Sequence, residues 1–165
     1  MLALLLSQLA MGQASADSPA LTPALTVGVV ELVGVAAPPV HLGVYGMVSL
    51  DLLIPLSDKW MLIPSNGFEF APENGHWGGF SFLILDTPIA EFGDTLLTLE
   101  PQVGLIHDAA PTGSGFDHAF FPTVGLGAAF NTPYASWVPT LTTSVGLKGE
   151  GVSQGFLLLF SVPID

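Results

Sequence analysis

The stretch that decides the fold is residues 40–54, VHLGVYGMVSLDLLI. Every second residue belongs to a set without polar side chains: Val40, Leu42, Val44, Gly46, Val48, Leu50, Leu52 and Ile54. The other set is mixed and partly polar: His41, Gly43, Tyr45, Met47, Ser49, Asp51 and Leu53. A period of two over this length predicts an extended strand with one apolar face. A strand that crosses a bilayer at a tilt needs about 9–11 residues, whereas strands in soluble proteins have about 5–6.

The composition points to the same kind of strand throughout the chain. The 165 residues suit one domain, and 50% of them are hydrophobic while only 10% are charged. Soluble domains carry about 25% charged residues, so this chain has too little charge for an ordinary wet surface. It also lacks a run of about 18 apolar residues, the length that a membrane helix needs. High apolar content without such a run is typical of a transmembrane β-barrel.

The charge balance excludes one class of partner. The chain has 14 acidic residues and only two basic ones, Lys59 and Lys148. Nucleic-acid binding is not expected, because phosphate contacts need a positive patch. Cysteine is absent, which excludes disulfides and thiolate chemistry.

The first sixteen residues have the features of a secretory signal. An apolar segment, residues 2–6, is followed by Ala14, Ser15 and Ala16, a small-residue cleavage pattern. No positive charge precedes Leu2, so we expect an upstream start or an unusual signal; the alternative is a buried N-terminal helix. The expected organisation is a signal peptide at 1–16 and a barrel domain at 17–165.

Alternation recurs along the rest of the chain. Eight strands are predicted, at 25–35, 40–54, 59–70, 79–86, 95–107, 118–130, 134–148 and 152–164. The third is the weakest, because Ser65-Asn66-Gly67 could break it, and both faces of 79–86 are apolar. Short links make neighbouring strands antiparallel, and closure removes the edges that lipid does not tolerate. The predicted fold is all-β: a single eight-stranded antiparallel up-and-down transmembrane β-barrel.

The last predicted strand carries a local motif. Residues 153–160, SQGFLLLF, follow the pattern polar-x-Gly-x-x-hydrophobic-x-aromatic. With this motif, the strand count and the signal segment, the chain resembles the small eight-stranded outer-membrane barrels of Gram-negative bacteria over nearly all of residues 25–164. That family usually ends on the aromatic residue, whereas this chain continues to Asp165.

The resemblance implies export, insertion by the barrel-assembly machinery and contact with outer-membrane lipid. Both termini should then face the periplasm, with the links at 36–39, 71–78, 108–117 and 149–151 outside. Basic residues are few, so tight binding of lipopolysaccharide phosphates is not expected.

Aromatic residues near the strand ends are candidates for the two interfacial girdles of such a barrel. They are Trp60, Phe70, Trp77, Phe80, Phe120, Phe130, Tyr134, Trp137 and Phe160. The alternative is that they form the core of a soluble sandwich.

Polar residues on the predicted inner faces are candidates for the lumen. The ionisable ones are Glu31, His41, Asp51, Glu100 and Lys148. An eight-stranded barrel has an interior just wide enough to be filled by side chains, and buried charges there must be paired or hydrated. Two interpretations stay open: a plugged interior with a Lys148–carboxylate pair, or a thin water path that prefers cations.

Two further hypotheses concern chemistry. His107, Asp108, Asp117 and His118 bracket one predicted loop, and such side chains suit a divalent transition metal; the simpler interpretation is a solvated loop base. A lipid-modifying enzyme would need a His, a Ser and an acid together, but His41 and Ser49 are eight residues apart, at about 3.3 Å each. No phosphate loop, G-x-S-x-G or H-E-x-x-H motif occurs. No cofactor is expected.

The expected function is therefore that of an outer-membrane barrel with a structural, adhesive or weakly pore-forming role. The alternatives are a secreted soluble β-barrel or sandwich that binds an apolar ligand, and a lipid-modifying outer-membrane enzyme.

Overall fold

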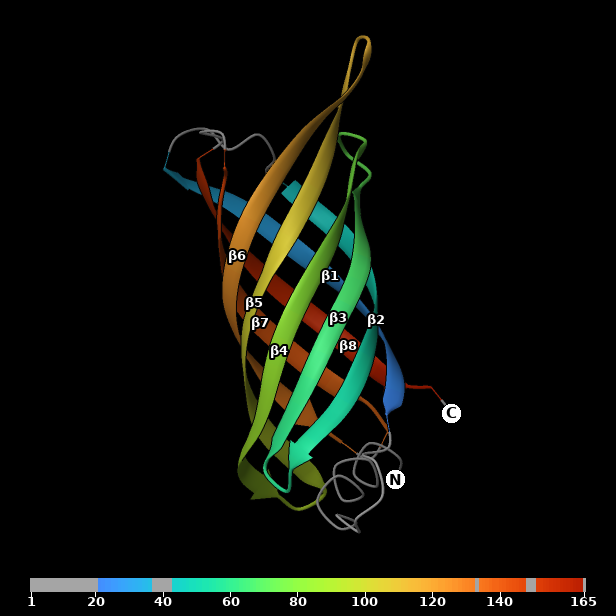
Figure 1. The fold of residues 1–165 in the computed structure, drawn as a ribbon, viewed down its shortest axis with the longest axis vertical. Coiled ribbons are helices and arrows are strands. Elements are labelled where there is room, and N and C mark those ends of the chain that lie inside the picture. The colour runs from blue at the N-terminus through green and yellow to red at the C-terminus, as the bar shows by residue number, and fades with distance from the viewer. Residues whose placement is uncertain (1–20, 37–42, 133, 148–150, 165) are drawn as a thin grey trace.

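Eight antiparallel strands form one closed barrel in the computed structural model (Figure 1). The model describes residues 21–36, 43–132, 134–147 and 151–164, so the expected signal segment, 1–16, lies outside the described residues. The strands are β1 (Thr22–Ala36), β2 (Gly43–Ser57), β3 (Trp60–Ala71), β4 (His76–Phe92), β5 (Thr95–Thr112), β6 (Gly115–Asn131), β7 (Ser136–Val145) and β8 (Val152–Pro163). Each strand pairs with the next, and β1 pairs with β8 to close the ring. The predicted up-and-down barrel is confirmed.

The two faces of β2 are those that its sequence predicts. Val48 and Leu50 are exposed on the outside, while Tyr45, Ser49 and Asp51 are buried inside. The alternation persists because successive side chains of a strand point to opposite sides of the sheet. The apolar set of the opening stretch therefore forms part of the outer surface.

The link predicted at 108–117 is wrong, because β5 and β6 continue through it. Ala109 pairs with His118 and Thr112 pairs with Gly115, which leaves a two-residue turn at 113–114. The pairing of β5 with β4 ends at Ala109, so Pro111 lies on a strand edge, where proline is tolerated. Residues 110–117, which we call the β5–β6 arm, project beyond the rest of the barrel (Figure 1).

Two other segments differ from the prediction. The third strand does not break at Ser65-Asn66-Gly67, because all three residues pair with both β2 and β4. The fourth strand is longer than 79–86, so the expected loop at 71–78 is reduced to residues 72–75. No helix in the described part of the chain is long and apolar enough to cross a membrane.

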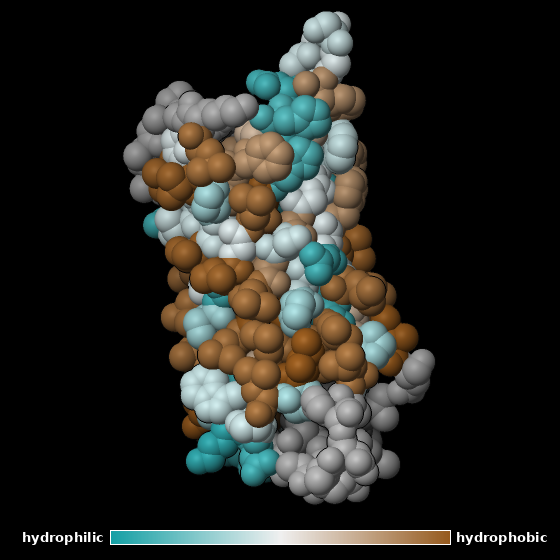
Figure 2. All heavy atoms as spheres, viewed as in Figure 1, coloured by the Kyte–Doolittle hydropathy of each residue, from teal (hydrophilic) through white to brown (hydrophobic). Residues whose placement is uncertain are grey.

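Much of the outer surface is apolar, as the brown area of Figure 2 shows, and exposed aromatic residues lie near both ends of this apolar belt. Of the girdle candidates, Trp60, Phe70, Phe120, Phe130, Tyr134 and Trp137 are exposed, while Trp77 and Phe160 are half-buried on outward-facing positions. Phe80 is the exception, since it points inward and is only 6% exposed. Its strand is apolar on both faces, so parity alone could not place it. The apolar belt contradicts a soluble barrel, whose outer face would need polar cover.

Candidate functional site

The interior of the barrel is filled on one side by large apolar side chains. The cluster of buried residues comes from β3 to β6 and comprises Ile63, Phe80, Phe82, Ile84, Ile106, Ala119 and Phe121. Met47, Leu53 and Met61 pack against it from β2 and β3. Phe121 is 1% exposed. The cluster places a packed core inside the ring, as in other small barrels.

Inward-facing glycines provide the room for these rings. A Cβ on Gly67 would lie 2.2 Å from Cζ of Phe80, its cross-strand partner. A Cβ on Gly104 would lie 2.4 Å from Cδ1 of Phe82, again its partner across the strands. At these two positions the ring of the cross-strand partner covers the glycine, so large and small side chains alternate in this part of the interior.

The opposite wall of the interior is more polar, although Val30 and Leu157 are buried there too, and Asp51 carries the one carboxyl group among its buried, described residues. Its buried residues on β1, β2, β7 and β8 include Thr26, Ser49, Thr140, Thr142, Ser144 and Ser153. Asp51 accepts hydrogen bonds from Thr26 Oγ1 at 2.5 Å and from Ser49 Oγ at 2.9 Å. Two hydroxyl donors thus replace part of the hydration that this carboxylate loses on burial.

A second polar group lies further along the lumen, toward the arm. His76 Nδ1 is 3.2 Å from Asp108 Oδ2 and 3.4 Å from the Tyr45 hydroxyl. Glu69, at 1% exposure, lies in the same region, and its Oε1 makes no hydrogen bond within the described structure. Among the described residues, His76 is the one basic side chain beside these two buried carboxyl groups, so the described part of this cluster is acidic overall.

The structure places the predicted lumen residues as follows. Asp51 is buried inside, and Glu100 is half-buried on the inner face, where it interacts electrostatically with Asp86 and Asp51. Glu31 was predicted to face inward, and this is wrong: it is exposed on the outside, between Val44 and Phe156 on the neighbouring strands. Its position follows the outward parity of β1. His41 and Lys148 lie outside the described residues, and so does any pair that Lys148 would form.

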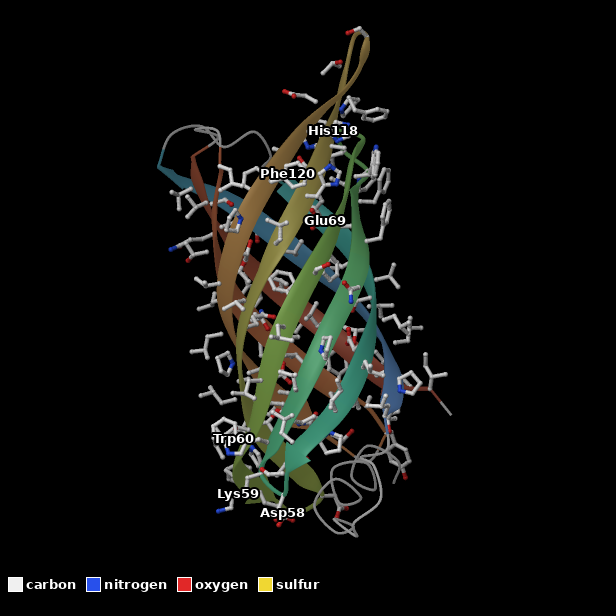
Figure 3. All side chains as sticks on the ribbon, in the orientation of Figure 1. Asp58, Lys59, Trp60, Glu69, His118 and Phe120 are labelled. Atoms are coloured by element: carbon white, nitrogen blue, oxygen red, sulfur yellow. The ribbon has the colours of Figure 1, made fainter. Side chains whose placement is uncertain are left out.

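Aromatic and histidine rings gather on the outer face at the base of the arm (Figure 3). Phe68 stacks on Trp77, whose edge meets His107 and Phe116. His107 Nε2 lies 2.9 Å from His118 Nδ1, and these rings are also stacked, with centroids 5.1 Å apart. The group forms one interfacial girdle, because amphipathic rings favour the level where lipid meets water.

The four metal-ligand candidates do not converge on one point. His107 and His118 meet on the outer face, whereas Asp108 points into the lumen toward His76. Asp117 is adjacent to His118 on β6, so its side chain lies on the other face of the strand, where it accepts a bond from the His118 backbone. No group of three or more His, Cys, Asp or Glu in the described ranges is arranged to hold a metal ion.

Sequence reasoning missed Glu69, His76 and Asp86 as interior groups. Glu69 was within reach, since it has the opposite parity to Phe68 and Phe70 on a predicted strand. His76 fell in a segment expected to be a loop, because Asn74-Gly75 is a turn signal. The turn does form there, with Gly75 at φ 72°, and β4 begins directly after it.

Comparisons with known proteins match the fold. No protein-family model and no curated protein matches the sequence. Among solved structures, the N-terminal β-barrel domain of OprF of Pseudomonas aeruginosa is similar with a TM-score of 0.56 and 14% identity, covering 90% of this chain and 100% of that chain. Ail, the attachment invasion locus protein of Yersinia pestis, gives a TM-score of 0.49 and 13% identity, covering 89% of this chain and 99% of Ail. Its complex with the heparin analogue sucrose octasulfate gives 0.48 and 12%, covering 87% and 97%. The chain has the fold of the small outer-membrane barrels.

Proposed function

We propose that this outer-membrane barrel is a structural, non-conducting protein that anchors the β5–β6 arm on the outer surface of the cell. The apolar cluster inside the barrel carries the proposal. Phe80, Phe82 and Phe121 are each at most 7% exposed. Phe80 packs over Gly67 and Phe82 packs over Gly104, and all three rings belong to the same buried cluster. An eight-stranded ring leaves about the space that side chains fill, so such a core leaves no continuous column of water.

The arm supports the second half of the proposal. Its two strands stay paired up to Thr112 and Gly115, next to the two-residue turn at the tip, so the arm is a regular β-hairpin and not an irregular loop. Phe116 is exposed there and packs against Trp77 at the arm's base. At the opposite end of the barrel, β4 and β5 are joined by a two-residue turn at Gly93-Asp94, and β2 and β3 by one at Asp58-Lys59. The end that carries the arm is therefore the one suited to contact with the surroundings.

Conductance in planar bilayers tests the closed lumen. The folded wild-type chain should give no steady current steps. The double variant Phe80→Ala, Phe121→Ala removes two rings from the core and should conduct cations, because Asp51, Asp86 and Glu100 line the described interior, where no Lys or Arg is found. Val124→Ala, on the outer face of β6, is the control and should stay silent. Steady wild-type conductance would overturn the proposal.

The orientation is tested on intact cells. The chain has no cysteine, so single cysteines report one place each. A membrane-impermeant thiol reagent should label Ser114→Cys at the arm's tip and should not reach Asp94→Cys at the other end. Labelling of Asp94→Cys alone would show that the barrel has the opposite orientation, and it would contradict the display of the arm on the cell surface.

A further inference from the structure

Two polar side chains interrupt the apolar belt on β3 and β4. Asn66 and Ser81 are cross-strand partners, and both are exposed on the outside of the barrel. In Figure 2 hydrophilic atoms break the brown surface over these strands at about mid-height. Their directly paired outward neighbours on either side are Leu50 and Leu105. The polar pair thus forms an island within apolar surface.

The island lies at hydrocarbon depth. A strand tilted by about 40° climbs roughly 2.5 Å along the barrel axis per residue. Asn66 is therefore about 15 Å above Trp60 and about 10 Å below Phe70, the girdle residues at the two ends of β3. These distances sum to about 25 Å, the height of the apolar band of such barrels.

The amide of Asn66 is only partly satisfied at that depth. Ser81 Oγ donates to Asn66 Oδ1 at 2.7 Å, which is the hydrogen bond that the structure gives this side chain. The Nδ2 group keeps two N–H donors without a partner in the described residues. Lipid tails cannot accept them, and an unpaired amide in hydrocarbon is costly.

We propose that two copies of this chain associate in the membrane plane through the surface around Asn66 and Ser81. An amide carries both donors and an acceptor, so Asn66 of each copy can donate to the other around a twofold axis. A different partner would have to present a matching polar group at this same depth. Gly79, directly above Ser81, has no side chain, and a Cβ there would meet only a backbone oxygen at 3.5 Å, so the surfaces can approach closely.

Cysteine cross-linking in liposomes tests this inference, which requires the membrane placement proposed above but not the closed lumen. Leu50→Cys and Leu105→Cys flank the island, while Leu158→Cys lies on β8, on the other side of the ring. Under oxidation, one or both flanking variants should give disulfide-linked dimers, and Leu158→Cys should stay monomeric. The result that overturns the proposal is equal dimer formation by all three, or none by the flanking variants, in protein whose heat-modifiable migration shows that it is folded.

The role of the amide itself is tested by Asn66→Leu in the flanking cysteine background. Losing two reciprocal hydrogen bonds should slow dimer formation about tenfold. Val48→Leu, a change on the same outer face without polar atoms, is the matched control and should leave the rate unchanged. Unchanged cross-linking in Asn66→Leu would show that this surface does not associate through the amide.

Discussion

The packed interior predicts a difference between two adjacent phenylalanines of β6. Phe121 points into the lumen and is 1% exposed, whereas Phe120 points outward and is 41% exposed. Changing either one to alanine loses the transfer free energy of the ring, which is about 1.5–3 kcal/mol. Only Phe121→Ala also leaves a cavity, because lipid tails close around a truncated side chain on the outside while the barrel wall does not.

The size of the difference follows from the volume removed. A hole of roughly 100 Å³ costs about 24 cal/mol per Å³, so Phe121→Ala should lower the free energy of unfolding by about 2 kcal/mol more than Phe120→Ala. Its total loss should then be about 3–5 kcal/mol, the range of Phe→Ala changes in protein cores.

Reversible urea unfolding from lipid vesicles, followed by tryptophan fluorescence, measures both variants. Heat-modifiable migration shows that each one folds. Equal losses of stability for the two variants would refute the closed interior, because a water-filled or loosely packed lumen would not penalise the inner ring more than the outer one.

Three further predictions follow from single contacts. Gly104→Ala should lower the urea midpoint far more than Gly46→Ala, because the added Cβ would lie 2.3 Å from Ser81 O in the first case and 3.9 Å from its nearest neighbour in the second; similar midpoints would contradict the close packing of Phe82 over Gly104. His76→Ala should destabilise the barrel by about 3 kcal/mol, since it removes the buried ring beside Asp108, whereas Tyr45→Phe, which removes one hydroxyl, should cost about 1 kcal/mol by the same unfolding assay; the reverse order would show that the histidine is not the partner that matters. Glu31→Leu should leave the folded fraction on gels unchanged or raised, whereas Asp51→Leu should reduce it, because of the two only Asp51 is inside and hydrogen-bonded. The opposite result would indicate that Glu31 faces the lumen.

The fold was predictable because outward-facing residues, which come at every second position, are mostly apolar, a pattern that the sequence shows directly. On β2 the outward set has no polar side chain, so parity, length and facing could all be read from one stretch. The same holds for β6, where Phe120 and Val124 oppose Phe121 and Thr123 as expected. Lipid imposes this pattern on every strand, which is why the number of strands and their pairing came out correctly.

The direction of a side chain was predicted wrongly where apolar and polar residues do not alternate clearly in the sequence. In β1, Val29 and Val30 are adjacent apolar residues, so alternation in the sequence did not decide which way Glu31 faces, and its charge led us to expect it inside. Its real position is beside Val44 and Phe156 in the part of β1 toward the arm's end, where an acid can reach water. Parity, not polarity, was the better guide there.

The interior could not be read from the sequence because it depends on cross-strand partners. Gly67 leaves room for the ring of Phe80, and Gly104 for that of Phe82, but these pairs can be inferred only when the register of β3 to β5 is known. The histidines show the same limit. His107 and His118 meet on the outer face, whereas Asp108 points into the lumen. Because successive side chains of a strand point to opposite faces, the four predicted metal ligands do not come together.

The measurement that tests the central claim most directly uses two neighbouring positions of β2. Single cysteines at Ser49, which is buried inside, and at Leu50, which is 57% exposed outside, are each treated in liposomes with a water-soluble and with a lipid-soluble thiol reagent. A closed barrel in a membrane predicts that the lipid-soluble reagent alone modifies Leu50→Cys and that neither reagent modifies Ser49→Cys. Modification of Ser49→Cys by the water-soluble reagent would contradict the closed lumen, and its reaction with Leu50→Cys would contradict the membrane-facing surface.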